Sequence, residues 1–354
     1  MTAASPLAAA PRVVRMTRAG QVAAVAGSVL VVVLASLPAW GGSGVQRLLV
    51  EFFTLMALAT MWNPLAGFAG LVSIGQQAFI GLGAYTILVA LDRLGLPPIV
   101  GLFVVATVIG VIALVTSAFV FRLSGGYFAI GMWVIAEVFR IVVTNTRELG
   151  AGTGISIRSL ASMPPPERQA LIYWLALAVG VGSIVLAALL VRSRLGLALR
   201  AVRDGESAAR SLGVDVGRAK LAVFVVAAIG SAIAGAVIYL QLLRIQPTAA
   251  FGVDWTAKII FIVVIGGLGR IEGPIVGAIV FFALQETLAD QGSLYLIILG
   301  VTAIAITLLA RNGLWGLFTS RFPVALFGIE RRLIVDEPDP PPVTATAVTA
   351  EDGQ

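Results

Sequence analysis

The chain is dominated by long apolar runs, and these constrain its fold more than any other feature. They recur along most of the 354 residues, of which 59% are hydrophobic and 12% charged. A helix needs about 20 apolar residues to cross the hydrocarbon core of a bilayer. Backbone groups in lipid must be paired internally, so spans are helices or a closed barrel, and barrel strands would alternate polar and apolar residues as these runs do not. The sequence therefore predicts an all-α, polytopic bundle of transmembrane helices.

About ten spans fit these runs. They are predicted at residues 21–40, 48–66, 68–91, 98–121, 125–143, 170–191, 221–243, 255–269, 273–290 and 294–310. The glycine-rich stretch at Leu65–Ala90 allows a broken helix, so the count lies between eight and ten.

The charge distribution predicts how the bundle lies in the membrane. The net charge is +6, and most of the basic residues fall in segments that share one side of the predicted spans. Such an excess indicates loop orientation rather than nucleic-acid binding. We therefore expect a cytoplasmic N-terminal segment at residues 1–20 and a transmembrane domain at 21–317 with a cytoplasmic loop at 192–220. The Pro- and Thr-rich tail at 335–354 is expected to be disordered and cytoplasmic.

The absence of certain residues excludes several kinds of chemistry. The chain has no cysteine and no histidine, which excludes disulfides, thiolate chemistry, imidazole metal sites and Ser-His or Cys-His catalysis. Neither lysine, Lys220 or Lys258, follows the glycine pattern of a P-loop. We therefore expect no cofactor on this chain, and any ATP hydrolysis would belong to another polypeptide.

The first segment with functional potential is Trp62–Thr86, which reads WNPLAGFAGLVSIGQQAFIGLGAYT. Pro64 removes a backbone donor, and five glycines permit a break or close helix contact. Four polar residues lie at membrane depth: Asn63, Ser73, Gln76 and Gln77. The segment is either a discontinuous helix that lines a translocation path or a packing surface with interhelical hydrogen bonds. Two adjacent amides, Gln76 and Gln77, are hard to satisfy by packing alone, which favours the translocation path.

A second segment, Gly125–Asn145, carries charge inside a predicted span. Glu137 and Arg140 are three residues apart, so they share a helix face and can pair. Ionisable groups in a span usually face a bundle interior or a water cavity, which suggests a functional site. A structural ion pair is the alternative. Glu137 and Tyr127 join the four polar residues above as candidates for the substrate path.

The third segment is the loop Arg192–Lys220. Good helix formers run from Ala198 to Leu212, and Gly213 is a stop signal. This helix would present four charged side chains to a soluble partner: Arg203, Asp204, Glu206 and Arg210. The alternative is an ordinary positive loop that binds anionic lipid headgroups. The loop carries both signs of charge and a helix that ends at a glycine. A surface that only binds lipid headgroups needs neither, so these features favour a soluble protein partner.

The fourth segment, Val264–Ala278, spaces Gly269, Gly273 and Gly277 four residues apart. This pattern predicts a face of small residues that packs against a neighbouring helix. Arg270 and Glu272 indicate a tight turn, so we expect a packed helical hairpin.

Four stretches together resemble the inner-membrane permease subunits of branched-chain amino-acid ABC importers, and their M-type in particular. They read GLVSIGQQAFIGLGAYT, GGYFAIGMWVIAEVFRIVV, RAVRDGESAARSLGVDVGRAKLAVFVVAAIGSAIAGAV and VIGGLGRIEGPIVGA. The resemblance covers about Leu48–Leu317. It implies that Arg200–Lys220 is the cytoplasmic coupling loop that docks on an ATPase subunit. Its residues would be Arg200, Arg203, Asp204, Glu206, Ala208, Ala209, Arg210 and Gly213, of which Glu206, Ala208, Ala209 and Gly213 match characteristic positions of the family.

The resemblance also implies partners and a function. A second permease subunit, two ATPase subunits that bind ATP and Mg, an extracytoplasmic solute-binding protein and membrane lipid would complete an importer in the bacterial inner membrane. It would carry branched-chain or related amino acids by alternating access. One alternative is a urea or short-amide permease of the same family, since this chain has Gln76 where many relatives carry histidine. Others are an ion-coupled secondary transporter, with Glu137 as relay, and a channel or structural subunit.

Overall fold

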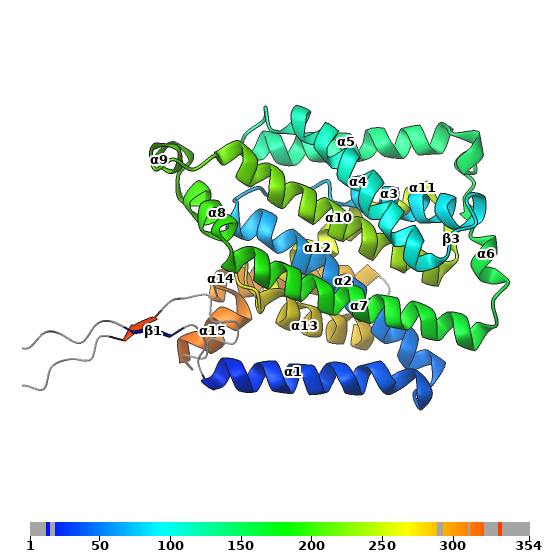
Figure 1. Cartoon of the computed structure of the whole chain (residues 1–354), viewed down its shortest axis with the longest axis horizontal. Helices are drawn as coiled ribbons and strands as arrows, with labels where there is room; N and C mark the ends of the chain where they lie inside the picture. Colours follow the sequence, from blue (N-terminus) through cyan, green and yellow to red (C-terminus); the bar gives the residue numbers. More distant parts are fainter. Residues whose placement is uncertain (1–11, 15–17, 289–292, 311, 322–331, 335–354) are drawn as a thin grey trace, which may run out of the picture.

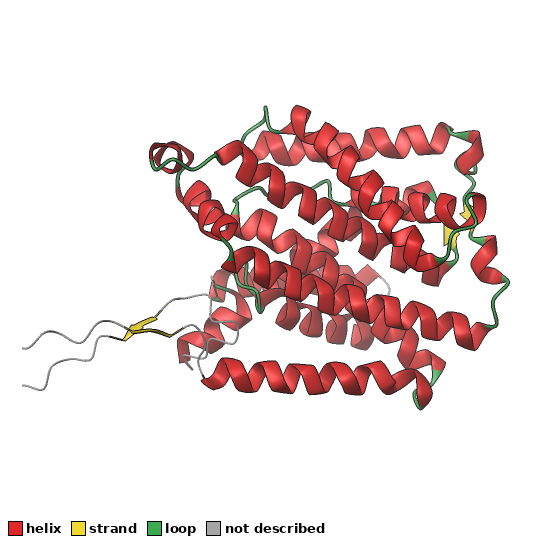
Figure 2. Ribbon diagram, viewed as in Figure 1, coloured by secondary structure: helices red, strands yellow, loops and turns green. Residues whose placement is uncertain are grey.

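The structure is a bundle of helices that run side by side along one axis (Figures 1 and 2). This computed structural model describes residues 12–14, 18–288, 293–310, 312–321 and 332–334. The all-helical prediction is confirmed. The predicted tail at 335–354 and most of the N-terminal segment at 1–20 lie outside the described residues.

Nine helices make up the body of the bundle within the described residues. They are α1 (Arg18–Ser36), α2 (Ser43–Asn63), α4 (Pro98–Val120), α5 (Gly126–Asn145), α7 (Pro165–Arg192), α10 (Val216–Leu242), α12 (Val253–Gly266), α13 (Gly273–Leu288) and α14 (Ser293–Leu309). A tenth, interrupted element joins them. It consists of the π-helical turn η2 (Pro64–Phe68), α3 (Gln77–Leu88) and the π-helical turn η3 (Val89–Arg93).

Short elements close the two ends of the bundle. The short helices are η1 (Leu37–Ala39), η4 (Arg147–Leu149), α6 (Arg158–Ala161), α8 (Arg194–Asp204), α9 (Glu206–Ser211), α11 (Pro247–Ala250) and α15 (Gly313–Arg321). Two antiparallel strand pairs are described. They are β1 (Arg12–Val14) with β4 (Arg332–Ile334), and β2 (Ile155–Ser156) with β3 (Arg244–Ile245).

Among the described residues, seven helices are long and apolar enough to cross a membrane. They are Ser43–Phe68, Pro98–Val120, Gly126–Asn145, Pro165–Arg192, Val216–Leu242, Pro247–Gly266 and Ile297–Arg321. Two further predicted spans are shorter apolar helices, at Ala24–Ala39 and Gly273–Leu288. The remaining one, at 68–91, is only partly helical. A count of ten spans and the orientation of the termini stay predictions.

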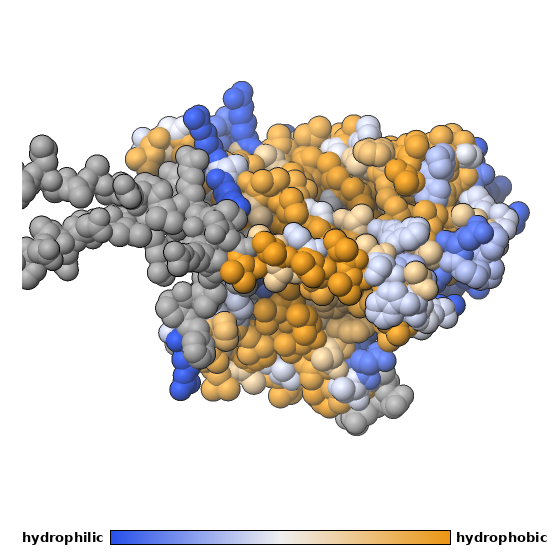
Figure 3. Space-filling model, turned by 60° about the horizontal axis from the view of Figure 1, so that its bottom comes forward, coloured by the Kyte–Doolittle hydropathy of each residue, from blue (hydrophilic) through white to orange (hydrophobic). Residues whose placement is uncertain are grey.

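We call the end of the bundle that carries α8 and α9 the loop end, and the opposite end, with α6 and α11, the far end (Figure 1). An apolar belt covers the surface between polar ends (Figure 3). Large apolar side chains are exposed in this belt, for example Phe103 at 70% and Phe119 at 65% on α4. A soluble protein rarely exposes so large an apolar surface, so the belt is suited to lipid or to partner helices.

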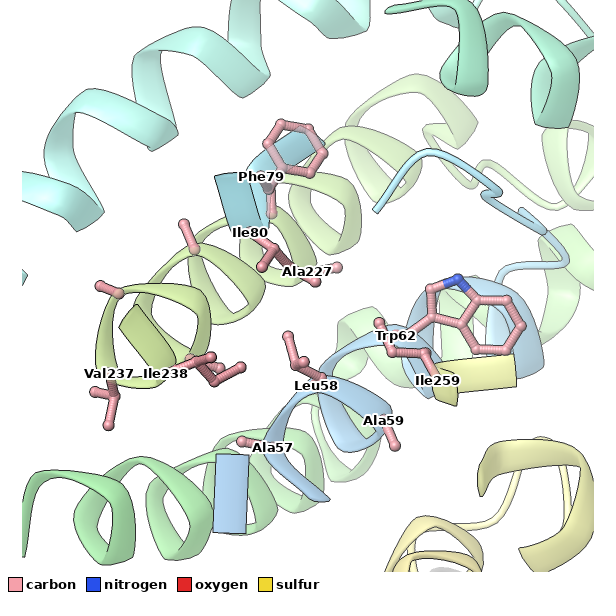
Figure 4. Packing of buried hydrophobic residues seen from close by; sticks show 14 of the residues in the cluster. Ala57, Leu58, Ala59, Trp62, Phe79, Ile80, Ala227, Val237, Ile238 and Ile259 are labelled. Carbon is pink, nitrogen blue, oxygen red and sulfur yellow. The ribbon is translucent and has the colours of Figure 1, made fainter. Parts of the chain in front are cut away.

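The core lies where α2, α3, α10 and α12 meet (Figure 4). Glycines let α3 and α10 approach backbone to backbone. A Cβ on Gly83 would lie 2.1 Å from the Ala232 carbonyl oxygen, and one on Gly235 would lie 2.6 Å from that of Ile80. Such positions admit only glycine without movement of the neighbouring helix. These two helices therefore form a rigid centre for the site described next.

The α12–α13 hairpin is packed as predicted, with one correction. A Cβ on Gly277 would lie 1.8 Å from the Ile262 carbonyl oxygen, and one on Gly273 would lie 2.2 Å from that of Gly267. Gly269, however, is not on the helix face, because α12 ends at Gly266 and Gly269 lies in the turn with φ of +76°. Of the three glycines spaced by four, only Gly273 and Gly277 therefore lie on a helix.

Candidate functional site

The loop between α7 and α10 forms two helices, so the prediction of one helix at 198–212 is wrong. α8 ends at Asp204, and α9 begins at Glu206 after Gly205. Glycine is a poor residue for a helix interior, and it allows the chain to turn here. Ser193 begins α8 by accepting a hydrogen bond from the Leu195 backbone N–H, at 3.2 Å.

Contacts within the loop give it a fixed shape. Val202, Ala209 and Val216 form a small buried cluster between α8, α9 and the start of α10. Lys220 forms an ion pair with Glu206, which also lies 3.8 Å from an Arg210 nitrogen. The loop is therefore an ordered body that can transmit a displacement.

One face of α9 is free for a partner. Ala208, Arg210 and Gly213 are exposed, whereas Ala209 faces inward. Leu212, which the sequence analysis passed over, is 80% exposed. A large apolar side chain directly before the glycine stop was the signal that could have identified it. Together these residues form a surface with an apolar centre and a charged edge.

The opposite face of the loop contacts the interruption of the α2–α3 segment. The Arg203 Nη1 donates to the Gly67 carbonyl oxygen at 2.8 Å. The Arg200 guanidinium lies 5.5 Å from the centre of the Phe68 ring. Gly67 and Phe68 belong to η2, so the loop and the interruption are joined directly.

The turn between α12 and α13 completes this contact. The Asn63 side chain donates to the Arg270 carbonyl oxygen at 2.7 Å and accepts from the Gly269 N–H at 2.9 Å. A Cβ on Gly67 would lie 2.4 Å from the Gly269 nitrogen. We call these five residues, Asn63, Gly67, Arg203, Gly269 and Arg270, the junction. Asn63, predicted for the substrate path, here holds two backbone segments together.

The helix is interrupted after η2, and the chain is irregular from residue 69 to 76. The Trp62 indole donates to the Ser73 carbonyl oxygen at 2.9 Å, and Ser73 is fully buried. Gln76 donates to the Ser231 hydroxyl at 2.8 Å, and the Gln77 carbonyl oxygen accepts from the Thr256 hydroxyl. α10 thus satisfies the amide nitrogen of Gln76, whereas its carbonyl oxygen is buried with no donor among the described residues. The role of both amides in a path stays a prediction.

The charged pair on α5 forms as expected, but at the surface of the chain. Arg140 Nε donates to both Glu137 carboxylate oxygens, at 2.8 and 2.9 Å. The Glu137 side chain is 46% exposed and that of Arg140 28%. Tyr127 on the same helix is 75% exposed. None of the three faces the interior of this single chain.

A further acidic residue, Glu51, lies in α2 within the predicted span at 48–66. Its carboxylate accepts a hydrogen bond from Gln285 of α13 at 2.7 Å. Glu51 was not among the predicted site residues, although an acidic residue in a predicted span was the signal that could have identified it. Among the described residues no three Asp or Glu side chains gather as ligands for a metal ion.

Comparison with known proteins identifies a family for the chain. The family described as "Branched-chain amino acid transport system / permease component" matches residues 44–307. The high-affinity branched-chain amino acid transport system permease protein LivM of Escherichia coli (strain K12) is 28% identical over 269 residues. That match covers 67% of this chain and 62% of the relative, so less than two thirds of the relative is matched.

Two other relatives widen the comparison. The probable branched-chain amino acid transport permease protein LivM of Methanocaldococcus jannaschii is 22% identical over 69% of this chain and 81% of its own. The ribose import permease protein RbsC of Haemophilus influenzae is 32% identical, but over 33% of this chain and 38% of its own. No solved structure matches the chain.

Proposed function

Because the chain belongs to the family of branched-chain amino acid transport permease components, we propose that it is the membrane-spanning permease subunit of an ATP-driven, binding-protein-dependent importer. The chain carries no P-loop, so ATP and Mg would bind to separate ATPase subunits. The loop end would face the cytoplasm of a bacterial cell, and the far end would receive cargo from an extracytoplasmic solute-binding protein. The cargo would be a branched-chain or related amino acid.

The junction is the observation that carries this proposal. It joins α8, the interrupted helix and the α12–α13 turn through hydrogen bonds of 2.7 to 2.9 Å. A displacement of the loop by an ATPase would therefore reach the turn η2 without a flexible linker between them. Alternating access requires that one conformational state gain free energy relative to the other, and the loop would deliver that difference.

The exposed face of α9 supports an ATPase partner rather than a lipid headgroup. A plain polybasic surface would suffice for lipid, but this face centres on Leu212, which is 80% exposed. Apolar anchors inside a charged rim are typical of protein interfaces. We propose that Leu212 inserts into an apolar groove of the ATPase subunit.

The outer face of α5 supports a second permease subunit. Its exposed apolar side chains include Trp133 and Val134, at 52% and 53%, and they flank the pair Glu137–Arg140. A charged pair that faces lipid is costly, and burial against another helix or a water-filled path removes this cost. The partner would be a like or unlike permease subunit, with Tyr127 and Glu137 near the shared surface.

Reconstitution of the complete complex tests the proposal. Proteoliposomes are prepared with the chain, its second permease, the ATPases and the binding protein. They should take up a branched-chain amino acid only when ATP is present on the side of the membrane that carries the ATPase subunits. Leu212→Ser should weaken ATPase binding about tenfold or more, by loss of an apolar anchor. Leu94→Ser is the control, since Leu94 is 59% exposed but follows η3, which contacts α6 at the far end.

Uptake that persists without ATP and collapses with an ion gradient would contradict the proposal and favour a secondary transporter. Uptake of urea but not of amino acids would keep the ATP-driven mechanism and replace the substrate class.

A further inference from the structure

A small half-open pocket lies at the far end of the bundle, between α2, α10 and α12. Its volume is about 140 Å³. A cavity of about 150 Å³ holds a molecule as large as benzene, so this pocket suits a small solute. Its polar lining residues are Glu51, Thr54 and Gln241, and its apolar ones include Leu55, Ile238 and Leu242.

The carboxylate in this pocket has no cationic partner. Glu51 is partly buried and forms no ion pair with any described residue. It accepts one hydrogen bond, from Gln285, at 2.7 Å. An ionisable group inside a membrane helix normally pairs with an opposite charge, so the pocket favours a cationic ligand group.

Near Glu51 there are more hydrogen-bond acceptors than donors, because two amide oxygens also lack a partner. The Gln241 and Gln285 carbonyl oxygens are buried and have no donor among the described residues. The Gln241 amide nitrogen donates instead to the Arg47 carbonyl oxygen, at 3.3 Å. Of these two residues only Gln241 lines the pocket. A primary ammonium has three N–H donors and no acceptor, so it complements the Glu51 carboxylate and the Gln241 side chain.

The neighbouring helix supplies the opposite charge. Trp255 lines the pocket, and its indole is fixed by a hydrogen bond to the Ala249 carbonyl oxygen at 2.9 Å. Lys258 lies one turn further along α12, with its nitrogen 5.1 Å from the centre of a Trp255 ring, and forms no ion pair with any described residue. Lys258 does not line the pocket itself, so it would act on a ligand carboxylate through its charge, from behind Trp255.

We propose that this pocket binds a free α-amino acid with an aliphatic side chain. Glu51 takes the ammonium group, Lys258 attracts the carboxylate, and the side chain lies against Leu55 and Ile238. The inference rests on the proposed function and deepens it, since it assigns the amino acid a place on the permease itself. Its lining residues on α10 and α12 lie near the far-end termini of those helices, where a binding protein would release its cargo.

Binding to the purified full-length chain tests the pocket without any partner. The chain is placed in phosphatidylcholine nanodiscs, whose headgroups carry no N–H donor, and L-leucine binding is followed by saturation-transfer NMR. Leucine should bind saturably, and 4-methylpentanoate, which lacks the ammonium group, should not. Glu51→Gln should weaken leucine binding about tenfold or more, since it removes a charge-assisted contact. Glu286→Gln, an exposed neighbour of Gln285, should leave it unchanged.

Glu51→Asp guards against a folding defect, because it keeps the charge and should retain part of the affinity. The pocket assignment is wrong if the wild type does not bind leucine, or if Glu51→Gln binds it equally well. Phosphatidylethanolamine offers the same ammonium chemistry, and the assignment is also wrong if that lipid occupies the site and leucine cannot displace it. In the reconstituted importer, normal ATP-driven uptake by Glu51→Gln would overturn the assignment of the pocket alone. No ATP-driven uptake by the wild type would instead overturn the proposed function.

Discussion

Asn63 and Glu51, towards the two ends of α2, differ in how their polar groups are satisfied, although the Thr60 hydroxyl near the loop end has no partner among the described residues. At the loop end, Asn63 uses both its amide nitrogen and its carbonyl oxygen on the backbone of the α12–α13 turn, and the Gly67 carbonyl oxygen accepts from Arg203. At the far end, Glu51 forms no ion pair with a described residue, and the Gln241 carbonyl oxygen has no described donor.

This contrast separates two tasks within one helix. Satisfied hydrogen bonds and close glycine contacts make a stiff connection, because any displacement costs several interactions at once. Unsatisfied acceptors beside an open pocket favour a ligand that supplies the missing donors. We infer that the loop end of α2 transmits motion, whereas its far end receives the solute.

The strongest test of the stiff end is Gly67→Ala. A Cβ here would lie 2.4 Å from the Gly269 nitrogen and 2.6 Å from its Cα, so the α12–α13 turn must move. Such overpacking costs about 1–3 kcal/mol, and we expect a lower melting temperature together with loss of ATP-coupled uptake. Gly182→Ala on α7 is the control, because its Cβ would meet no atom within 4 Å. Wild-type uptake by Gly67→Ala would show that the contact is not needed.

Removal of one hydrogen bond should have a smaller, more specific effect. Arg203→Ala deletes the donor to the Gly67 carbonyl oxygen at 2.8 Å. The stability loss should be about 1 kcal/mol, because the Arg203 side chain is 45% exposed and water competes for the bond. Uptake per ATP hydrolysed should fall, while ATPase binding is kept. Arg218→Ala removes an 89% exposed arginine from the same loop and should leave this ratio unchanged; an equal fall in both variants would contradict a specific role.

The loop itself offers a test of backbone shape rather than of contacts. Gly213 has φ of +82°, and a Cβ there would meet no atom within 4 Å. Gly213→Val is therefore strained by its backbone conformation alone, at a cost of about 1–3 kcal/mol confined to the loop. Uptake should be uncoupled from ATP hydrolysis while the protein stays in the membrane. Gly217→Ala in α10 is the matched control, and normal coupling in Gly213→Val would count against a docking role.

Much of the stiff end could be predicted from the sequence, because its signals are local. Pro64 and the glycines that follow indicated an interrupted helix, and Gly213 indicated where the loop helix ends. The contacts themselves could not be predicted, since Arg203 and Gly67 are 136 residues apart. The break at Gly205 was missed although Asp204–Gly205 is a dipeptide typical of turns, because alanines and arginines on both sides favour one continuous helix.

The far end was largely hidden from sequence reasoning. Glu51 is a single acid in an apolar run, and its partner Gln285 is 234 residues away. Lys258 falls within the predicted span at 255–269 and lies in α12, but no local pattern indicates that this helix packs beside α2. A pocket that several helices build together has no local pattern, so only the packing reveals that these groups face one another.

The smallest expected effect concerns how the far end is held together outside the pocket. Asp92 accepts hydrogen bonds from the Arg158 N–H at 2.8 Å and the Ser159 N–H at 2.9 Å, and it also accepts from the Ser159 hydroxyl. Burial alone would raise the pKa of Asp92, but these hydrogen bonds and the nearby Arg158 charge together lower it below its usual value of 3.8. The ionised form is thus favoured in the folded state, so its stabilisation is full well above pH 3.8 and is lost as the pH falls through the lowered pKa.

Asp92→Asn should therefore melt at a lower temperature than the wild type at pH 7, and the gap should narrow below about pH 4. The loss should stay under about 1 kcal/mol, since Asp92 is exposed and water screens the charge. Leucine binding should not change, because Asp92 does not line the pocket. A gap that persists unchanged at pH 3 would mean that the contact acts through shape rather than charge. A parallel loss of leucine binding would mean that the Asp92 contact and the pocket at Glu51 are coupled. The pocket would then depend on the packing of the whole far end and not only on its own unsatisfied acceptors.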